Sequence, residues 1–247
     1  MKTLDLSFSE PALNLACDEV LLDEVHSGNR EPTLRFWESP SLFVVVGYGN
    51  DIELECQTQA CQKLGIPILR RSSGGGTVLQ GPGCLNYSLI LQIADNEKTG
   101  NIGTTNCHVM RTNRDALGQA LGQAIEIEGH TDLAIDGVKF SGNAQRRKRD
   151  ALLFHGTILL AFDLPLIGQA LRLPSSEPDY REGRSHETFC RNIPLTPEVV
   201  KQALGQSWLC GGQAPPIDAG KVQRLAGEKY SRPDWIHRRA KRSQASE

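Results

Sequence analysis

The chain has 247 residues, of which 39% are hydrophobic and 23% charged, as is typical of a globular protein with ample material for a core. Its formal net charge of −2 argues against broad binding to nucleic acid, which usually requires a basic balance. The N-terminus carries no signal-type apolar segment, and no run is long enough to cross a bilayer. Seven cysteines, odd in number and without CxxC spacing, indicate reduced thiols in a cytoplasmic protein.

The first part of the chain predicts helices interleaved with short strands. Residues 11–26 carry apolar side chains at helical spacing, and Pro11 suits a first turn. A second helix is predicted over 51–65, with Asp51 as its N-cap and Gly65 as its stop. Runs rich in β-branched and other apolar residues predict strands at 33–38, 41–49, 66–70 and 84–93.

The second part begins with a helix predicted over 106–125. Asp136-Gly137 is a strong hairpin signal that joins two of the strands predicted at 132–135, 137–142 and 152–161. Strands outnumber the crossover helices that a regular βαβ alternation needs, so we expect an α+β fold with mixed, largely antiparallel sheets. Helical segments and loops follow, and residues 238–247 form a polar tail.

The stretch RRSSGGGTVLQGPG, from Arg70 to Gly83, is the most distinctive part of the sequence. Glycines 74–76 allow backbone N–H groups to approach a ligand and to form a nest for an anion. Arg70 and Arg71 beside them suit bidentate contact with phosphate or carboxylate. No Walker or dinucleotide-binding spacing is present. A purely structural loop, whose arginines pair with acids, remains the alternative.

A second candidate stretch is DGVKFSGNAQRRKRDALLFHGTILL. Lys139 alternates with Val138 and Phe140 in a short strand, so it points away from them, either to solvent or into a pocket where its ammonium stabilises developing negative charge. The small residues after it, among them Ser141 and Gly142, suit close approach of a substrate. His155 in the next strand is more often a packed residue than a catalyst. The basic run 146–149 is either a patch for an acidic ligand or a solvated turn.

These two stretches, in this order, resemble the lipoate–protein ligase family, within the biotin/lipoate/octanoyl transfer superfamily. The resemblance covers about residues 1–237 and includes LNLACDEVLL, LRFWESPSLFVVVGYGN and KYSRPDWI. It implies one catalytic domain of biotin-ligase type, related to class II aminoacyl-tRNA synthetases, over 1–237. It also implies that lipoate or octanoate and MgATP form an acyl-AMP, whose acyl group passes to a lysine of a lipoyl-domain or H-protein-like carrier protein.

The resemblance also implies roles for individual residues. Lys139 would be catalytic, at the junction of carbonyl and phosphate. The residues expected to bind ATP and acyl-AMP with it are Arg71, Gly76, Thr77, Val78 and Leu79. The residues expected to border the acyl group are Arg70, Gly75, Ser141, Gly142 and His155. Asp132 is a weaker candidate for Mg²⁺ or partner contacts.

Two departures from the family pattern limit these expectations. Gln80 stands where the family often has histidine, so any role of that imidazole is absent. The sequence also ends near the close of the catalytic domain, which implies either a separate accessory polypeptide or none.

Three other functions are weighed against the ligase. An ATP-independent octanoyltransferase would need a cysteine nucleophile before the lysine-bearing strand, and 126–139 contains none. Cys84 is more simply a small apolar residue of a buried strand. A non-catalytic scaffold that binds lipoyl domains need not keep Lys139 and the glycines, and a biotin ligase fits RRSSGGG less well. The polar segment 177–192 is expected to lie near the site and to touch the carrier domain.

Overall fold

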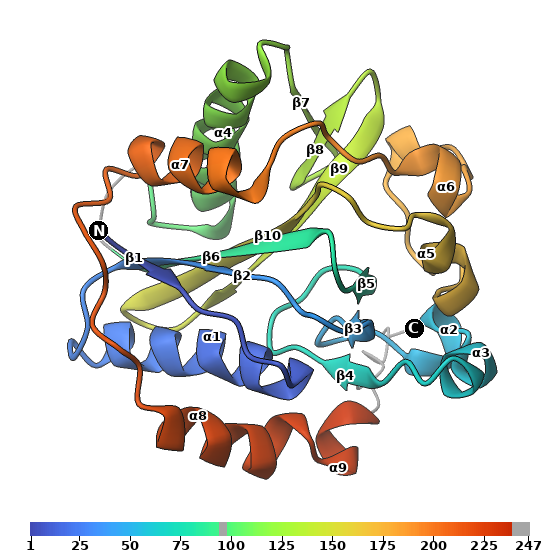
Figure 1. Cartoon of the computed structure of the whole chain (residues 1–247), viewed down its shortest axis with the longest axis horizontal. Helices are drawn as coiled ribbons and strands as arrows, with labels where there is room; N and C mark the ends of the chain where they lie inside the picture. Colours follow the sequence, from blue (N-terminus) through green and yellow to red (C-terminus); the bar gives the residue numbers. More distant parts are fainter. Residues whose placement is uncertain (94–97, 239–247) are drawn as a thin grey trace, which may run out of the picture.

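The strands of the protein form one large and one small sheet (Figure 1). They are β1 Lys2–Asp5, β2 Thr33–Trp37, β3 Phe43–Val46, β4 Ile68–Arg70, β5 Val78–Gln80, β6 Cys84–Gln92, β7 Glu126–Glu128, β8 Asp132–Ile135, β9 Val138–Arg147 and β10 Ala151–Leu159. The large sheet has the order β1-β2-β6-β10-β9-β8-β7 and is antiparallel except between β1 and β2. The small sheet has the order β4-β3-β5. The expected α+β fold with largely antiparallel sheets is confirmed.

This computed structural model describes residues 1–93 and 98–238, so residues 239–247 of the expected polar tail lie outside the described part. Its helices are α1 Pro11–His26, α2 Ile52–Glu55, α3 Thr58–Lys63, α4 Ile102–Leu121, α5 Pro165–Ala170, α6 His186–Phe189, α7 Pro197–Ser207, α8 Ala219–Leu225 and α9 Pro233–Ile236. Within the described ranges, no helix is both long and apolar enough to pass through a membrane.

The helices cover both faces of the large sheet, with α4 and α7 on one side and α1 and α8 on the other (Figure 1). Strand β6 runs through the middle, and its side chains alternate between two cores because successive strand residues face opposite ways. Leu89 packs in the core beneath α4 and α7, and Ile90 packs in the core against α1. The prediction of a strand buried on both faces is therefore confirmed for residues 84–91, whereas Gln92 is exposed and Ile93 is half-buried.

The predicted helix over 51–65 is wrong in its continuity, because α2 and α3 replace it. Asp51 caps α2 as expected, but Cys56 between the two helices is extended. The backbone N–H of Gln57 donates to Ala170 at 2.8 Å, and Glu55 accepts from the N–H of Arg172 at 2.9 Å. These tertiary hydrogen bonds to the end of α5 replace helical ones, so the chain bends there.

Two other boundaries differ from the sequence prediction for local reasons. Helix α4 starts earlier than residue 106 because Asn101 and Thr104 form a capping box, and it ends at Gly122 in the left-handed conformation. Strand β9 runs on to Arg147, so half of the basic run lies in the sheet. The Asp136-Gly137 hairpin is confirmed, with φ of 53° and 69° at its two turn residues.

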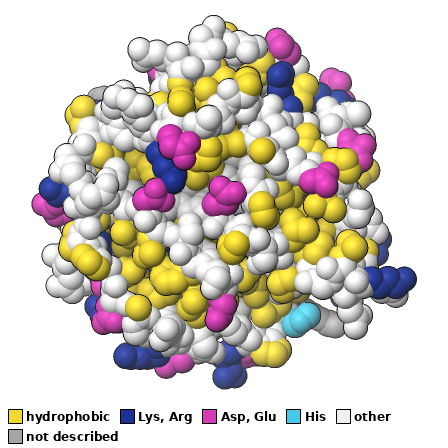
Figure 2. Space-filling view, in the orientation of Figure 1, with side chains coloured by type: hydrophobic (Ala, Val, Ile, Leu, Met, Phe, Trp, Pro, Cys, Tyr) yellow, Lys and Arg dark blue, Asp and Glu magenta, His cyan; other side chains and the backbone are white. Residues whose placement is uncertain are grey.

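Charged side chains are dispersed over the face of the molecule shown in Figure 2. Lys and Arg lie mostly toward its rim, interspersed with Asp and Glu, while apolar side chains occupy much of the middle. This face therefore presents no broad single-sign field of the kind that attracts nucleic acid.

Candidate active site

A cavity of about 430 Å³ opens between the segment 71–77, here named the glycine loop, and the strands β9 and β10. It brings together residues that are far apart in the sequence. Its lining includes every predicted site residue except Arg70: Arg71, Gly75, Gly76, Thr77, Val78, Leu79, Asp132, Lys139, Ser141, Gly142 and His155. The two stretches singled out in the sequence thus face one space.

One part of the cavity wall is apolar. Its walls come from the core between α1 and the large sheet, through Leu15, Trp37, Val45, Val78 and Leu153. Such a slot suits a hydrocarbon chain, because apolar surface leaves water when the chain enters.

The apolar slot is backed by a buried ion pair between two elements of the fold. The Nη1 of Arg35 on β2 lies 2.6 Å from Oδ1 of Asp18 on α1, and Arg35 has no exposed surface. Ser88 donates to the second oxygen of Asp18 at 2.8 Å. The pairing of Asp18 with Arg35 and Ser88 thus links α1 to strands β2 and β6 of the large sheet.

The two arginines of the glycine stretch bind backbone carbonyls of the protein itself. The Nη2 of Arg71 donates to Gly76 O at 2.7 Å, and its Nε donates to Gly74 O at 3.1 Å, so Arg71 closes the loop on itself. The Nη1 of Arg70 donates to Gly47 O at 2.8 Å and to Asn50 O at 2.7 Å. Arg71 therefore braces the glycine loop, whereas Arg70 braces the connection between β3 and α2 and does not line the cavity.

The neighbouring β3–α2 connection approaches the glycine loop closely. A Cβ on Gly47 would lie 2.1 Å from the carbonyl oxygen of Gly75, a distance that backbone cannot tolerate. Gly75 itself has φ of +84°, a left-handed conformation that favours glycine. Glycine is thus required at 47 because backbone meets backbone there, and it is favoured at 75 because of the left-handed φ.

His155 on β10 pairs with the glycine loop. Its Nε2 lies 2.6 Å from Oγ of Ser73, which also accepts from Nε of Arg71 at 3.1 Å. Since that oxygen accepts from Arg71, its own proton is available to His155. Burial, together with the charge of Arg71, lowers the pKa of His155 to about 3. The imidazole is therefore neutral near pH 7 and acts as a hydrogen-bond partner of Ser73.

Lys139 reaches the cavity from β9 and is held by an acid. Its Nζ lies 2.8 Å from Oδ1 of Asp132, and the hydroxyl of Tyr180 donates to Oδ2 of the same carboxylate at 2.8 Å. A Cβ on Gly142 would lie 2.8 Å from Nζ of Lys139, so glycine there leaves room for the ammonium. Of the two orientations that the sequence left open for this lysine, solvent or pocket, the structure has the one that lines the cavity.

Asp132 does not fit a resident metal ion. Both of its oxygens are engaged, one by an ammonium and one by a hydroxyl. In the described ranges, no three His, Cys, Asp or Glu side chains are grouped so that they could hold an ion.

Gln80, in the position where a histidine was expected, belongs to a polar triangle that lines the cavity. Its Nε2 donates to Oγ1 of Thr157, whose hydroxyl donates to Oδ1 of Asn86 at 2.6 Å. Asn86 in turn donates to Oε1 of Gln80 at 3.0 Å. The amide of Gln80 thus takes part in a closed hydrogen-bond network, which fixes three cavity-lining side chains in place.

Cys190 is the cysteine that sequence reasoning missed. It lines the cavity, and its backbone bridges to that of Lys139, where the N–H of Arg191 donates to Lys139 O at 2.8 Å. Burial raises the pKa of its thiol, although Lys139 and Arg181 act in the opposite direction. Cys84 is fully buried in the core around the small sheet, as expected for an apolar packing residue.

The polar segment 177–192 lies near the site, as the sequence predicted. It contributes Glu177, Arg181, His186, Phe189 and Cys190 to the cavity wall. Only its polarity and position in the sequence pointed to it, since none of these residues belongs to a recognisable motif.

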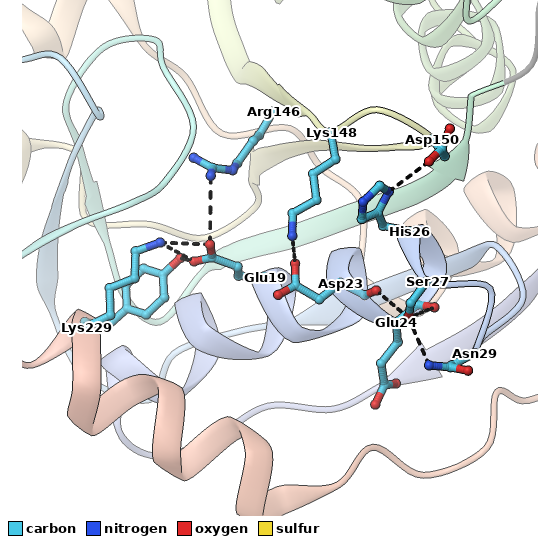
Figure 3. Close-up of polar contacts among 11 residues, drawn as sticks. Glu19, Asp23, Glu24, His26, Ser27, Asn29, Arg146, Lys148, Asp150 and Lys229 are labelled. Carbon is cyan, nitrogen blue, oxygen red and sulfur yellow. Dashed lines mark hydrogen bonds and ion pairs between the residues drawn. The ribbon is translucent and has the colours of Figure 1, made fainter.

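The C-terminal segment forms another part of the wall that the sequence did not indicate. Tyr230 lines the cavity, and its hydroxyl donates to Oε2 of Glu19 on α1. Lys229 donates to the same carboxylate, and Nη2 of Arg146 lies 4.0 Å from it (Figure 3). Lys148 pairs with Asp23 on α1 (Figure 3), and Nη1 of Arg147 donates to Oγ1 of Thr105 on α4 at 3.0 Å. The basic run therefore contacts helices on both faces of the sheet, and Arg149 alone of its four residues is largely exposed.

Comparison with known proteins identifies the class to which this fold and cavity belong. The family described as the lipoyl protein ligase A/B catalytic domain matches residues 10–204. The chain therefore belongs to this family and is an enzyme of the lipoate ligase and octanoyltransferase group.

Relatives of both activities resemble the chain. A probable lipoate-protein ligase A of Mycoplasma pneumoniae is 30% identical over 179 residues, which are 72% of this chain and 51% of that protein. An octanoyltransferase LipM of Moorella thermoacetica is 29% identical over 274 residues, covering 96% of this chain and 98% of its own length. The chain spans about half the length of the first relative and nearly all of the second.

Two solved structures share the fold. A bi-partite lipoate protein ligase from Thermoplasma acidophilum, described with its E2 lipoyl domain, superposes with a TM-score of 0.77 at 22% identity, covering 96% of this chain and 95% of its own. A lipoate-protein ligase A bound with ATP superposes with a TM-score of 0.78 at 23% identity, covering 96% and 98%.

Proposed function

We propose that the protein is an ATP-dependent lipoate–protein ligase. In the first step, the carboxylate of lipoate or octanoate attacks the α-phosphorus of ATP, forming acyl-AMP and releasing pyrophosphate. In the second, the amine of a carrier-protein lysine attacks the acyl carbonyl, loses a proton and displaces AMP. The acyl-AMP supplies its own leaving group, so the enzyme needs no covalent intermediate.

The observation that carries the proposal is the position of Lys139 opposite the glycine loop in a cavity whose wall is partly apolar. The acyl chain would lie along Leu15, Trp37 and Val45, with its carbonyl carbon toward Ser141 and Gly142. The nucleotide would lie against the backbone of Gly76, Thr77, Val78 and Leu79. Lys139 would exchange Asp132 for the oxygens between carbonyl and phosphate, where negative charge develops in both steps.

Because Arg71 contacts the glycine loop itself, we assign the expected phosphate contacts to backbone N–H groups of that loop. Because Arg71 is occupied by Gly74 O and Gly76 O, the N–H groups of the loop are what it presents to a phosphate. Gly75 and His155 would border the acyl group, with neutral His155 holding Ser73 in place.

The acceptor in this proposal is the lysine of a lipoyl-domain or H-protein-like carrier. The likeness of the fold to a bi-partite ligase described with its E2 lipoyl domain supports both this partner and a separate accessory polypeptide. A reconstitution with and without such a polypeptide would decide whether the chain needs one.

A second function, ATP-independent octanoyl transfer, is favoured by the position of Cys190 beside Lys139. In that reaction the thiolate attacks the octanoyl thioester of a carrier protein, releases the carrier thiol and then passes the octanoyl group to the acceptor lysine. We place it second because burial raises the pKa of the Cys190 thiol, which keeps it protonated near neutral pH.

The deciding experiment incubates the purified protein with a lipoyl-domain acceptor and one of two donors. The first donor is lipoate or octanoate with MgATP, and the second is octanoyl carrier protein without ATP. Mass spectrometry of the acceptor is the measurement. We expect a mass gain only with ATP, whereas a gain only from the octanoyl carrier would overturn the ligase proposal. No gain under either condition would favour a scaffold.

A further inference from the structure

We propose that Arg181 forms an anion subsite for a substrate phosphate in the cavity, on the same aromatic ring as Lys139. This inference deepens the proposed function and rests on its assignment of the cavity as the reaction site. The cavity lacks free cations from the glycine stretch, because Arg70 and Arg71 both donate to backbone carbonyls. A phosphate in the cavity would need another cation besides Lys139.

Arg181 meets the requirement by burial and by an unused donor. It lines the cavity and is only 4% exposed. Its Nε donates to Arg184 O at 3.0 Å, and its Nη2 lies 3.3 Å from Nδ1 of His186. Its Nη1 donates to no acceptor in residues 1–93 and 98–238. Nη1 is not among the fully buried nitrogens that lack a partner, so it keeps some accessible surface. Because Arg181 lines the cavity, a ligand there can accept a charge-assisted hydrogen bond from it.

His186 supports the guanidinium of Arg181 without neutralising its charge. Its Nε2 lies 2.9 Å from Arg172 O, which can only accept, so Nε2 carries the proton and Nδ1 accepts from Arg181. The histidine is thus a neutral support for the guanidinium. The nearest acid, Glu177, lies 3.6 Å from Nε of Arg181 and its side chain is 37% exposed, which makes it a weak and displaceable counter-ion.

The same aromatic ring relates Arg181 to Lys139. The guanidinium carbon of Arg181 lies 4.5 Å from the centroid of Phe189, and Nζ of Lys139 lies 5.9 Å from it. Both cations therefore stand within 6 Å of one ring. Lys139 would take the oxygens at the acyl–phosphate junction, and Arg181 would take the phosphate oxygens beyond it.

The phosphate has two possible sources, because both reactions use a phosphate-bearing donor. In the ligase it would be the polyphosphate of ATP, which leaves as pyrophosphate. In the transferase it would be the phosphodiester of the phosphopantetheine arm that carries the octanoyl thioester. The subsite is the same in both cases, so each source is given its own arm of the test.

The first arm measures the dissociation constants of ATP and of inorganic pyrophosphate by calorimetry. We expect Arg181→Met to weaken both about tenfold to a hundredfold, the value of a lost charge-assisted hydrogen bond. The matched control is Arg184→Met. Arg184 stacks on the same ring and holds Gly137 O, but it does not line the cavity. A clearly smaller loss in the control supports the subsite, and an equal loss in both variants overturns it.

The second arm is used if the wild-type protein binds neither ATP nor pyrophosphate. That result would contradict the ligase proposal but not the anion subsite. It compares KM for octanoyl-phosphopantetheine and for octanoyl-pantetheine, which lacks the phosphate. Arg181→Met should raise the first KM about tenfold or more and leave the second unchanged. If Arg181→Met folds, as judged by its thermal melt, and alters neither the dissociation constants nor the KM for octanoyl-phosphopantetheine, the subsite does not exist. Arg181→Lys, which keeps the charge, replaces it if the first variant fails to fold.

Discussion

The ammonium of Lys139 lies 2.8 Å from Oδ1 of Asp132, whose other oxygen accepts the hydroxyl of Tyr180. The carboxylate thus links β9 to the segment 177–192 and holds the ammonium in the cavity. We expect Lys139→Met to lower the rate of acyl transfer about 10²- to 10³-fold, as loss of a charge-stabilising group does. Single-turnover kinetics of each half-reaction, starting from free acid or from acyl-AMP, would measure it. A variant with normal rates in both would disprove the assignment.

The stability of the Lys139 variant should change little. The ion pair is partly exposed, so its loss should cost less than about 1 kcal/mol of the free energy of unfolding. Denaturant unfolding checks this, and a large loss would mean that any drop in rate reflects misfolding instead of chemistry.

Gly47→Ala should displace the glycine loop. The added Cβ would lie 2.1 Å from Gly75 O, so one of two backbone segments must move. Gly49→Ala is the matched control, because a Cβ there meets nothing within 4 Å. We expect the first variant to lose most activity and the second to keep it, as measured by acceptor modification. Equal activity would show that the loop position is unimportant.

Arg71→Met should destabilise the protein by removing the donors that close the glycine loop. Gly74 O and Gly76 O would lose their partners. Both glycines are exposed, so water can replace part of each contact, and we expect a loss of about 1 kcal/mol per hydrogen bond. Arg149→Met, whose side chain is 90% exposed, removes the same charge without these contacts. Chemical denaturation of both variants should show a loss only for Arg71→Met.

The stability of the protein should fall with acidification partly through His155. The pKa of its buried imidazole is lowered to about 3, while an unfolded histidine titrates near 6.5. Between these values the unfolded chain binds a proton that the folded one excludes, so the free energy of unfolding falls as pH falls, by up to about 1.4 kcal/mol per pH unit. In His155→Gln this slope should be smaller between pH 6.5 and 4.5. Identical slopes would contradict the buried neutral state.

Cys190→Ser separates the two proposed reactions. A ligase needs no thiol, so ATP-dependent modification of the acceptor should keep its wild-type rate in this variant. Cys84→Ser serves as a comparison that disturbs the core around the small sheet without touching the cavity. Loss of octanoyl transfer in Cys190→Ser, together with no ATP-dependent activity in the wild type, would establish the transferase instead.

Much of the fold followed from short-range patterns in the sequence. The helix at 11–26, the buried strand at 84–93 and the hairpin turn at Asp136-Gly137 agree with the structure because backbone preference and apolar spacing act within a few residues. The predicted helix at 51–65 failed at Cys56 and Gln57, whose neighbourhood bonds to the end of α5. No local preference reports such a distant partner.

The sequence by itself determined that glycines and arginines stand together and that a strand lysine alternates with apolar residues. Only the tertiary structure decided what Arg70 binds, because its acceptors at Gly47 and Ile236 come from other segments. It also decided that Cys190 and Arg181 share a cavity with Lys139. Their approach depends on how the segment 177–192 packs across β9. That packing is a balance of burial and chain entropy over the whole molecule, which no single motif contains.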